Sequence, residues 1–376
     1  MSKLLKKLLT REVRSRIILN ESHLPKIALF SPFPPQKSGI AHYTARFLPT
    51  LRKFANVQMF SSRTIDGESE YASLFRWGTF PADKRIITMG NSHFHSQGFD
   101  LMQFSKSTII CHDVSIENLL RSMSIQSPIN QAPQDLTIKE IHWQGKNSLE
   151  ILNVSNHNLV FHDSEIVREM NTESKSNSYF IPFMNLRDFG IEEKQPRNLL
   201  RISLFGEQNF QEKMLGMIPE ISSWLEIYGV KHEFRVVGYL HPLLRIELET
   251  KFRIVENHKA LTFTGYISEN EYRKELTNTD VGLQMRQSNY LTLSGAASDL
   301  AVFGIRSVVP QTMKFSMQLP EYFYGLPADI SPYIVAQTII NSLNYPDHLI
   351  ENERIRYVEL TSPENYVEQL LRVLEL

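Results

Sequence analysis

The sequence of 376 residues contains a single cysteine, Cys111. One thiol can neither form an intrachain disulfide nor supply a multi-thiolate metal site, so disulfide-stapled secreted domains and zinc-cysteine modules are excluded. This cysteine content is typical of proteins made for a reducing compartment, and we therefore expect a cytoplasmic protein.

The chain also lacks long apolar runs and an excess of charge of one sign. It has no run of about 18 or more apolar residues that could cross a bilayer and no secretory signal. Lys and Arg number 40 against 41 Asp and Glu, a net charge of -1, which argues against a protein that coats nucleic acid. We expect a soluble protein, or one bound peripherally at the inner face of a membrane, with no nucleic acid partner.

What the sequence does contain, from residue 26 onward, is an alternation of short apolar runs with amphipathic stretches. This alternation is typical of βα units built around parallel sheets that are buried on both faces. A polar loop near residues 185–197 separates two halves of similar size, so the pattern predicts two α/β domains. The runs are KIALFSPF, NVQMFSS, RIITMGN, STIICHD and HNLVFHDS in the first half, and LLRISLFG, EFRVVGY, LTFTGY, DVGLQM and RSVVP in the second.

A nicotinamide-dependent dehydrogenase shares this alternation. However, no Gly-x-Gly-x-x-Gly follows the first apolar run, and no acidic residue stands at the distance where such enzymes bind the ribose. These two absences argue against that class.

We expect the chain to divide into four segments. Residues 20–190 form the first α/β domain, residues 195–355 form the second, and residues 362–376 form a closing amphipathic helix that packs back on the first domain. The segment 1–19 comes before them and is basic and amphipathic. Residues 1–17 are either a helix that lies on an acidic membrane surface or a solvated terminal helix, because their apolar stripe is short.

In sheets of this type, ligands bind at the carboxyl ends of the strands, so the residues that follow each apolar run are candidates. Ser38 and Gly39 follow the first run and begin a helix, whose terminal N–H groups could face an anion. The histidines at strand ends are either hydrogen-bonded structural groups or groups that orient a substrate hydroxyl. No His-x-x-x-His pattern accompanies them, so we expect no metal site. The candidates of the first half are Ser38, Gly39, His93, His95, His112 and Asp113.

The second half places two cations shortly after apolar runs. They are Lys213 and Arg286, and Ser294 with Gly295 begins the helix that follows. Two cations and the N–H groups of a helix start suit the charge of a diphosphate.

Taken in order, these segments resemble the retaining GT-B glycosyltransferases of the group 1, or family 4-like, family, and in particular its bacterial branch. The resemblance implies two Rossmann-like domains facing across a cleft, a nucleoside-diphosphate sugar held mainly by the C-terminal domain, and transfer with retention at the anomeric carbon. The matching strings run from residue 31 to about residue 327 and are SPFPPQKSGIAHYT, MGNSHFH, ICHDV, VFHDSEIV, FRVVGY, LTFTGYISENEYRKELTNTDVGLQMR, LSGAASDLAVFGIRSVV and QLPEYFYGLP.

The resemblance also implies roles for the candidate residues. His112, Lys213 and Arg286 are the expected catalytic residues: the histidine faces the sugar and the acceptor, and the cations stabilise the departing diphosphate. The donor sugar is a co-substrate, and no metal or other cofactor is expected. The expected donor-binding residues are Ser38, Gly39, Lys213, Arg286, Thr292, Ser294, Gly295 and Asp299, and the expected acceptor-side residues are His93, His95 and Asp113.

The chain departs from the family at two glutamates that normally stand eight residues apart. The second falls on Asp299, which keeps a carboxylate for the ribose hydroxyls, whereas the first falls on Leu291 or Thr292, which have none. Two functions therefore stay open. One is a hexosyltransferase that acts on a glycan or lipid-linked acceptor in polysaccharide biosynthesis. The other is a catalytically degraded GT-B protein that serves as a binding or chaperone subunit beside a partner glycosyltransferase. The retained basic residues favour the enzyme.

Overall fold

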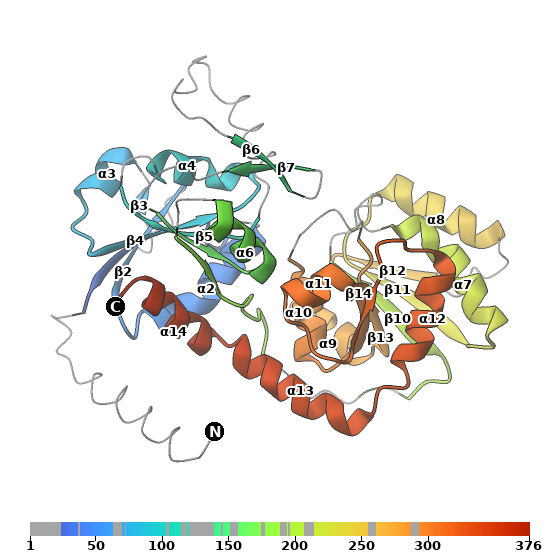
Figure 1. Cartoon of the computed structure of the whole chain (residues 1–376). Coiled ribbons are helices and arrows are strands. Elements are labelled where there is room, and N and C mark those ends of the chain that lie inside the picture. The colour runs from blue at the N-terminus through green and yellow to red at the C-terminus, as the bar shows by residue number, and fades with distance from the viewer. Residues whose placement is uncertain are drawn as a thin grey trace. The chain divides into compact units, whose positions relative to one another are not determined.

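In the computed structural model the chain divides into two compact units (Figure 1). The first unit consists of Met1–Phe161, Ile166–Ile181 and Pro363–Leu376, and the second of His162–Glu165 and Pro182–Ser362. Among the described residues, no helix is both long and apolar enough to cross a membrane. The structure describes residues 24–36, 38–62, 70–71, 73–102, 105–113, 119, 139–143, 146–150, 157–173, 177–188, 194, 196–206, 214–254, 261–286 and 293–376.

The first unit is built on a seven-stranded sheet with the order β3-β2-β1-β4-β5-β8-β9, in which every neighbouring pair is parallel. Ile27 to Phe30 of β1 are all fully buried, as expected for a strand covered on both faces. The strand order reverses between β1 and β4. The strands are β1 (Lys26–Phe30), β2 (Asn56–Ser61), β3 (Glu70–Tyr71), β4 (Lys84–Met89), β5 (Thr108–Cys111), β8 (Asn158–Phe161) and β9 (Asn177–Phe180).

Helices cover this sheet, and the last helix of the chain is one of them. In α14, Tyr366 packs against α2, with its ring centre 5.5 Å from that of Tyr43 and 5.4 Å from that of Phe47. The remaining elements include a separate antiparallel hairpin of β6 and β7. The elements are α2 (Gly39–Leu51), α3 (Leu74–Thr79), η2 (His93–His95), α4 (Ser96–Met102), β6 (Lys139–Trp143), β7 (Lys146–Glu150), α6 (Ser164–Glu173) and α14 (Pro363–Val373).

The second unit has a six-stranded parallel sheet with the order β12-β11-β10-β13-β14-β15. Counted along the chain within this unit, that order is 3-2-1-4-5-6, the Rossmann arrangement. The elements are β10 (Leu200–Phe205), η3 (Leu215–Met217), α7 (Ile218–Ile227), β11 (His232–Val237), α8 (Pro242–Ile254), β12 (Leu261–Gly265), α9 (Glu269–Thr277), β13 (Val281–Leu283), α10 (Gly295–Val302), β14 (Arg306–Pro310), α11 (Gln311–Ser316), β15 (Phe323–Leu326), α12 (Pro332–Ser342) and α13 (Asp347–Leu360).

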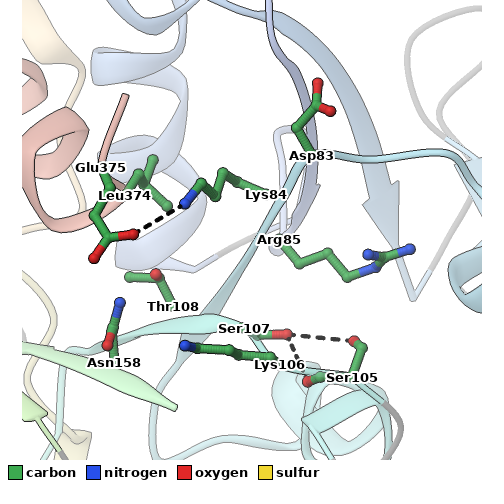
Figure 2. Close-up of a pocket in the computed structure, with 10 residues that line it drawn as sticks. All are labelled: Asp83, Lys84, Arg85, Ser105, Lys106, Ser107, Thr108, Asn158, Leu374 and Glu375. Atoms are coloured by element: carbon green, nitrogen blue, oxygen red, sulfur yellow. Dashed lines mark hydrogen bonds and ion pairs between the residues drawn. The ribbon is translucent and has the colours of Figure 1, made fainter. Parts of the chain in front are cut away.

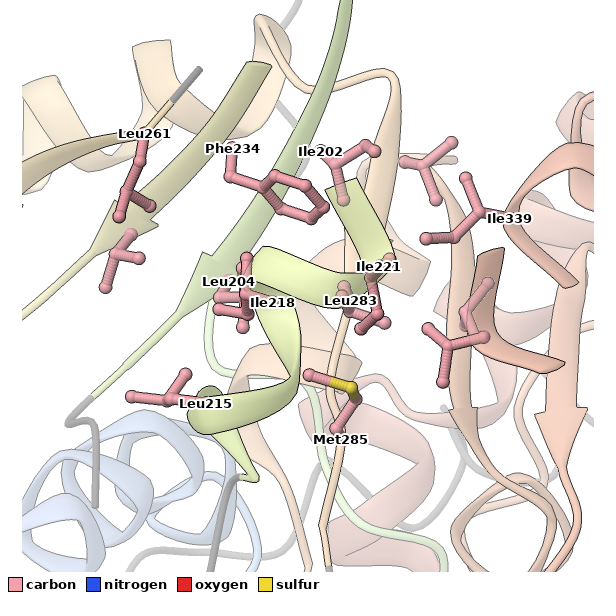
Figure 3. Close-up of a cluster of buried hydrophobic side chains, with 14 of the residues drawn as sticks. Ile202, Leu204, Leu215, Ile218, Ile221, Phe234, Leu261, Leu283, Met285 and Ile339 are labelled. Atoms are coloured by element: carbon pink, nitrogen blue, oxygen red, sulfur yellow. The ribbon is translucent and has the colours of Figure 1, made fainter. Parts of the chain in front are cut away.

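Alternation along β10 sends apolar and polar side chains to opposite faces of this sheet. Ile202 and Leu204 join a buried cluster with Ile218 and Ile221 of α7 and Ile339 of α12 (Figure 3). Each such side chain contributes about 1.5–3 kcal/mol when fully buried. This core fixes the sheet against its helices on one face.

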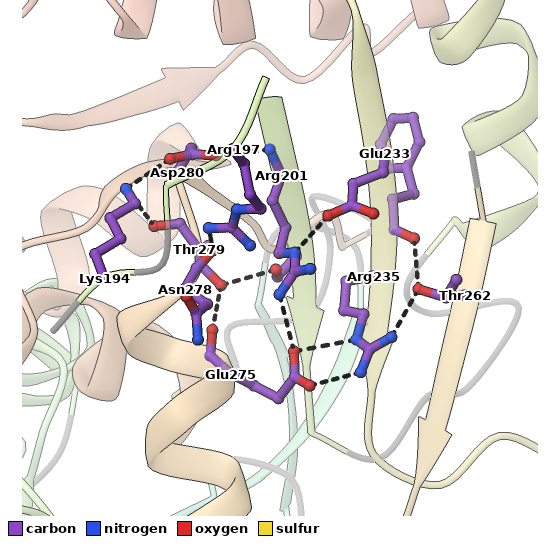
Figure 4. A network of polar contacts seen from close by, with 12 residues as sticks. Lys194, Arg197, Arg201, Glu233, Arg235, Thr262, Glu275, Asn278, Thr279 and Asp280 are labelled. Atoms are coloured by element: carbon purple, nitrogen blue, oxygen red, sulfur yellow. Dashed lines mark hydrogen bonds and ion pairs between the residues drawn. The ribbon is translucent and has the colours of Figure 1, made fainter. Parts of the chain in front are cut away.

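The opposite face carries ion pairs that attach α9 to the sheet (Figure 4). Glu275 of α9 lies 2.6 Å from Arg235 of β11 and 3.8 Å from Arg201 of β10. Because these side chains are half-buried, the pairs define how α9 lies on the strands more than they add stability. The sequence prediction of two Rossmann-like α/β domains is confirmed.

Candidate functional site

The carboxyl edge of the second sheet is where the sequence predicts the donor site. Its strand order reverses between β10 and β13, and the crevice outside such strand ends is where α/β folds bind ligands. Gly206 follows β10, and Arg286, which is half-buried, comes shortly after β13. Gln284 follows β13 directly and is buried.

Backbone lines part of this edge. Gly206 and Gly238, which follow β10 and β11, have φ angles of 91° and 127°, in the region that favours glycine. A Cβ atom on Gly238 would collide with the carbonyl group of Gly206. The two strand ends therefore approach each other without side chains between them. The Gly206 N–H donates to the Val237 carbonyl oxygen at 2.9 Å, and the Gly238 N–H donates to the Thr264 hydroxyl at 3.2 Å.

Helix α10 starts at this edge because it follows β13. Ser294 is its N-cap, and the Ser294 hydroxyl accepts a hydrogen bond from the Ala297 N–H at 3.1 Å. Gly295 is the first helical residue, as the sequence predicts. The N-terminus of a helix carries partial positive charge, so Arg286 and the start of α10 give this edge a positive character.

Asp299, one turn into α10, is 2% exposed and is engaged by other side chains. Its Oδ2 lies 2.6 Å from Nη1 of Arg187 and accepts a hydrogen bond from the Tyr272 hydroxyl at 3.1 Å. Arg187 also holds Glu269 with two hydrogen bonds of 2.9 and 3.1 Å, and its guanidinium lies 4.5 Å from the centre of the Tyr272 ring. Arg187 is thus the centre of a four-residue polar cluster that includes Asp299.

Burial dominates the electrostatics of that cluster. It raises the pKa of the Asp299 carboxyl above its ordinary value, while the charge and hydrogen bond of Arg187 oppose the rise. Burial also opposes protonation of Arg187, but the charge of Asp299 and the hydrogen bond to Glu269 outweigh it and raise the pKa of the guanidinium. The 2.6 Å between Nη1 and Oδ2 is the distance of a close ion pair.

The cluster's members other than Asp299 were not among the sequence-predicted site residues. Tyr272 and Glu269 lie in the string LTFTGYISENEYRKELTNTDVGLQMR, so a signal for them exists in the sequence. Arg187 lies 112 residues before Asp299, and no spacing rule connects them.

The corresponding edge of the first unit gathers several predicted residues. Ser38 is the N-cap of α2 but its side chain makes no capping hydrogen bond, and Gly39 begins the helix. A Cβ atom at Gly39 would have no neighbour within 4 Å among the described residues, so they leave the space beside it open. None of these residues requires glycine here, and the space suits a bound group.

His95 and Asp113 converge on Gly90, the residue after β4. A Cβ atom on Gly90 would lie 3.0 Å from His95 Nε2 and 3.2 Å from Asp113 Oδ2. His95 is fully buried with Nδ1 3.0 Å from the Thr88 carbonyl oxygen, and its Nε2 has no hydrogen-bond partner among the described residues. Burial, helped by the nearby His93, lowers the pKa of His95 to about 4 against the opposing Thr88 hydrogen bond. The ring is neutral at pH 7.

The other two histidines differ in exposure. His112 follows β5, is buried, and packs edge-on against Tyr43 at 4.6 Å between ring centres. His93 is exposed, with its ring 4.1 Å from that of Phe94. In the described part of the chain no three His, Cys, Asp or Glu side chains are grouped as a metal site would require.

Two cavities in the described residues lie at the opposite, amino ends of the strands. One of about 280 Å³ is lined by Lys84, Arg85, Lys106 and Asn158, with Lys84 3.6 Å from Glu375 (Figure 2). The other, of about 480 Å³, lies beside Leu200 at the start of β10. We place the candidate site at the carboxyl edges instead, because strand order there creates the binding crevice.

Some predicted residues lie outside the described part of the chain. They are Lys213, Thr292 and the basic segment 1–17. Their roles stay predictions.

Comparison with known proteins supports the fold. No protein-family model matches the sequence, and no curated protein matches it. Among solved structures, sucrose-phosphate synthase from Thermosynechococcus elongatus is similar with a TM-score of 0.65 at 14% identity, covering 93% of this chain and 98% of that one. A glycosyltransferase from Rickettsia africae gives 0.62 at 10% identity, covering 94% and 98%. Anabaena HepE, solved in complex with UDP and glucose, gives 0.59 at 10% identity, covering 93% and 99%. The chain has the GT-B fold of these proteins.

Proposed function

We propose that the chain is a glycosyltransferase that moves a hexose or deoxyhexose from a nucleoside-diphosphate sugar to an acceptor hydroxyl, with retention and without a metal ion. The observation that carries the proposal is the carboxyl edge of the second sheet. There the strand-order reversal, the glycine-lined strand ends, Arg286 and the start of α10 come together in a GT-B fold. Glycans and lipid-linked glycans are the proposed acceptors.

In the proposed chemistry, the second unit binds the leaving group, which is the nucleoside diphosphate. As the bond between sugar and diphosphate breaks, negative charge grows on the departing oxygen. Arg286 and the N–H groups at Ser294 and Gly295 would stabilise that charge, with Lys213 as the second cation. Asp299 would bind the ribose of the nucleotide.

The first unit would hold the reacting sugar and the acceptor. His112, His95 and Asp113 lie at the ends of neighbouring strands, and Gly39 borders open space at the start of α2. Because His95 is neutral with Nδ1 directed to the Thr88 carbonyl, its Nε2 can accept a hydrogen bond from a sugar hydroxyl.

The test is a screen of UDP, GDP, ADP and dTDP sugars by thermal shift and by nucleotide release. We expect one donor class to stabilise the chain and to be hydrolysed or transferred. Arg286→Ala should lower turnover by about 10²–10³-fold, as loss of a charge-stabilising donor does elsewhere. Arg245→Ala is the matched control, because Arg245 pairs with Glu249 on the exposed side of α8. Stabilisation without turnover would make the chain a binding subunit, and no response to any donor would refute both roles.

A further inference from the structure

The two carboxylate oxygens of Asp299 have different surroundings. Oδ2 receives both Arg187 Nη1 and the Tyr272 hydroxyl. Oδ1 is buried and has no hydrogen-bond partner within the part of the chain that the structure describes. An unpartnered buried acceptor is costly for a protein to keep. Among the described residues nothing fills this position, so the geometry suits a donor group of a bound ligand.

Arg187 is held on three sides, and so it fixes the carboxylate beside it. It makes two hydrogen bonds to Glu269, lies against the ring of Tyr272 and contacts Asp299. A guanidinium has the planar geometry that two carboxylates and an aromatic ring can all engage, and an ammonium does not. With Oδ2 held in this way, Asp299 cannot turn its second oxygen elsewhere.

Leu186, the residue before Arg187, lies beside the start of α10. A Cβ atom on Gly295 would lie 3.5 Å from a methyl group of Leu186. Asp299 follows Gly295 by four residues, which places it on the same side of the helix and about 6 Å further along the axis. A nucleotide whose diphosphate meets the helix start can thus extend its ribose toward Asp299.

Resting on the proposed function, we propose that Arg187 is a positioning residue for nucleotide recognition: it holds Asp299 so that Oδ1 alone accepts one ribose hydroxyl of a nucleoside diphosphate. A carboxylate with both oxygens available can accept both hydroxyls of a ribose. Here only one hydroxyl is bound by the carboxylate, and the geometry of Arg187 decides which.

The experiment is calorimetric titration of the full chain, first with UDP, GDP, ADP and dTDP. The 2′-deoxy and 3′-deoxy analogues of whichever ribonucleotide binds are then compared with the parent. We expect one analogue to bind about tenfold more weakly, as loss of a hydrogen bond to a charged group predicts, and the other to bind within about twofold of the parent.

Variants then distinguish a role of Arg187 in positioning Asp299 from a role in the stability of the fold alone. Asp299→Asn should abolish the difference between the analogues, and Arg187→Lys should reduce it to less than about threefold. Arg187→Lys keeps a cation beside the buried carboxylate, so the fold should persist. The double variant should equal Asp299→Asn alone, because Arg187 acts through Asp299. Arg245→Lys, on α8, should leave the difference unchanged. The affinity ratio is the readout, because a purely structural role would change only thermal stability.

Each other outcome overturns the inference. Equal weakening of both analogues would mean that both hydroxyls are bound, and no weakening of either would mean that neither is. An unchanged ratio in Arg187→Lys would remove the positioning role and leave the proposed function intact. Failure of all four nucleotides to bind would overturn the proposed function and this inference together.

Discussion

His95 lies where β4 ends, fully buried, with one ring nitrogen used by the Thr88 carbonyl. Burial lowers its pKa from 6.5 to about 4. Between these two values the unfolded chain binds a proton that the folded chain does not, so stability rises with pH across this window. The contribution of His95 is therefore present above pH 6.5 and is lost as the pH falls toward 4.

We predict that His95→Gln weakens the acid sensitivity of the fold. From pH 7 to pH 5, His95 alone should lower the wild-type free energy of unfolding by ~2 kcal/mol, and glutamine has no such proton to take up. Urea unfolding at the two pH values measures the difference. His42→Gln is the control, because His42 is exposed and is not among the groups that lower the pKa of His95. Equal pH dependence in His95→Gln and wild type would contradict the prediction. Burial also lowers the pKa of His157. Its contribution to the pH dependence of unfolding should be the same in wild type, His95→Gln and the control variant.

At the residue scale, the sequence predicted which residues begin a helix better than it predicted which side chains contact them. Ser294 and Gly295 begin a helix where the sequence placed one, because an N-cap and its first turn are local features. The engagement of Asp299 by Arg187 is not local, since the two are 112 residues apart and meet only through the fold. That contact, and not the acid alone, determines which carboxylate oxygen is available.

At the scale of elements, apolar runs predicted the interior strands and missed several edge strands. The runs KIALF and RIITM correspond to β1 and β4, which have neighbours on both sides. The strands β3, β9 and β15 lie at sheet edges and were not predicted as strands. An edge strand has one neighbour and is less completely enclosed, so its sequence need not be a continuous apolar run.

The last helix, α14, gives a prediction at this scale. Its buried face consists of Tyr366, Val367, Leu370 and Val373, and it packs on α2, more than 300 residues earlier in the chain. Leu370→Ala should lower the free energy of unfolding by about 2–5 kcal/mol, because it leaves a cavity in a fully buried contact. Glu368→Ala is the control, because Glu368 is exposed on the same helix. Equal urea midpoints for the two variants would show that α14 does not stabilise the first unit.

At the scale of the molecule, both units repeat one topological plan. Each sheet reverses its order between its first and fourth strands, the position at whose carboxyl edge folds of this kind bind ligands. The family resemblance implied the Rossmann-like plan of each unit, whereas the alternation of runs alone predicted two α/β halves built on parallel sheets. That alternation could not predict which unit takes the nucleotide, because that depends on the side chains and backbone at two similar edges. The second unit is favoured by Arg286 and the capped start of α10.

We predict that a bound nucleoside diphosphate protects the second unit from hydrogen exchange. With ligand at about 100 times its dissociation constant, mass action stabilises the unit that binds it by ~2.7 kcal/mol, which slows exchange through unfolding about 100-fold. Protection should be strongest where β10 and β13 end and in the first turn of α10, and β1 to β5 should change little. Arg286→Ala at the same nucleotide concentration is the control and should lose most of the protection. Protection confined to the first unit, at the start of α2, would place the nucleotide there and reverse the assignment of the two edges.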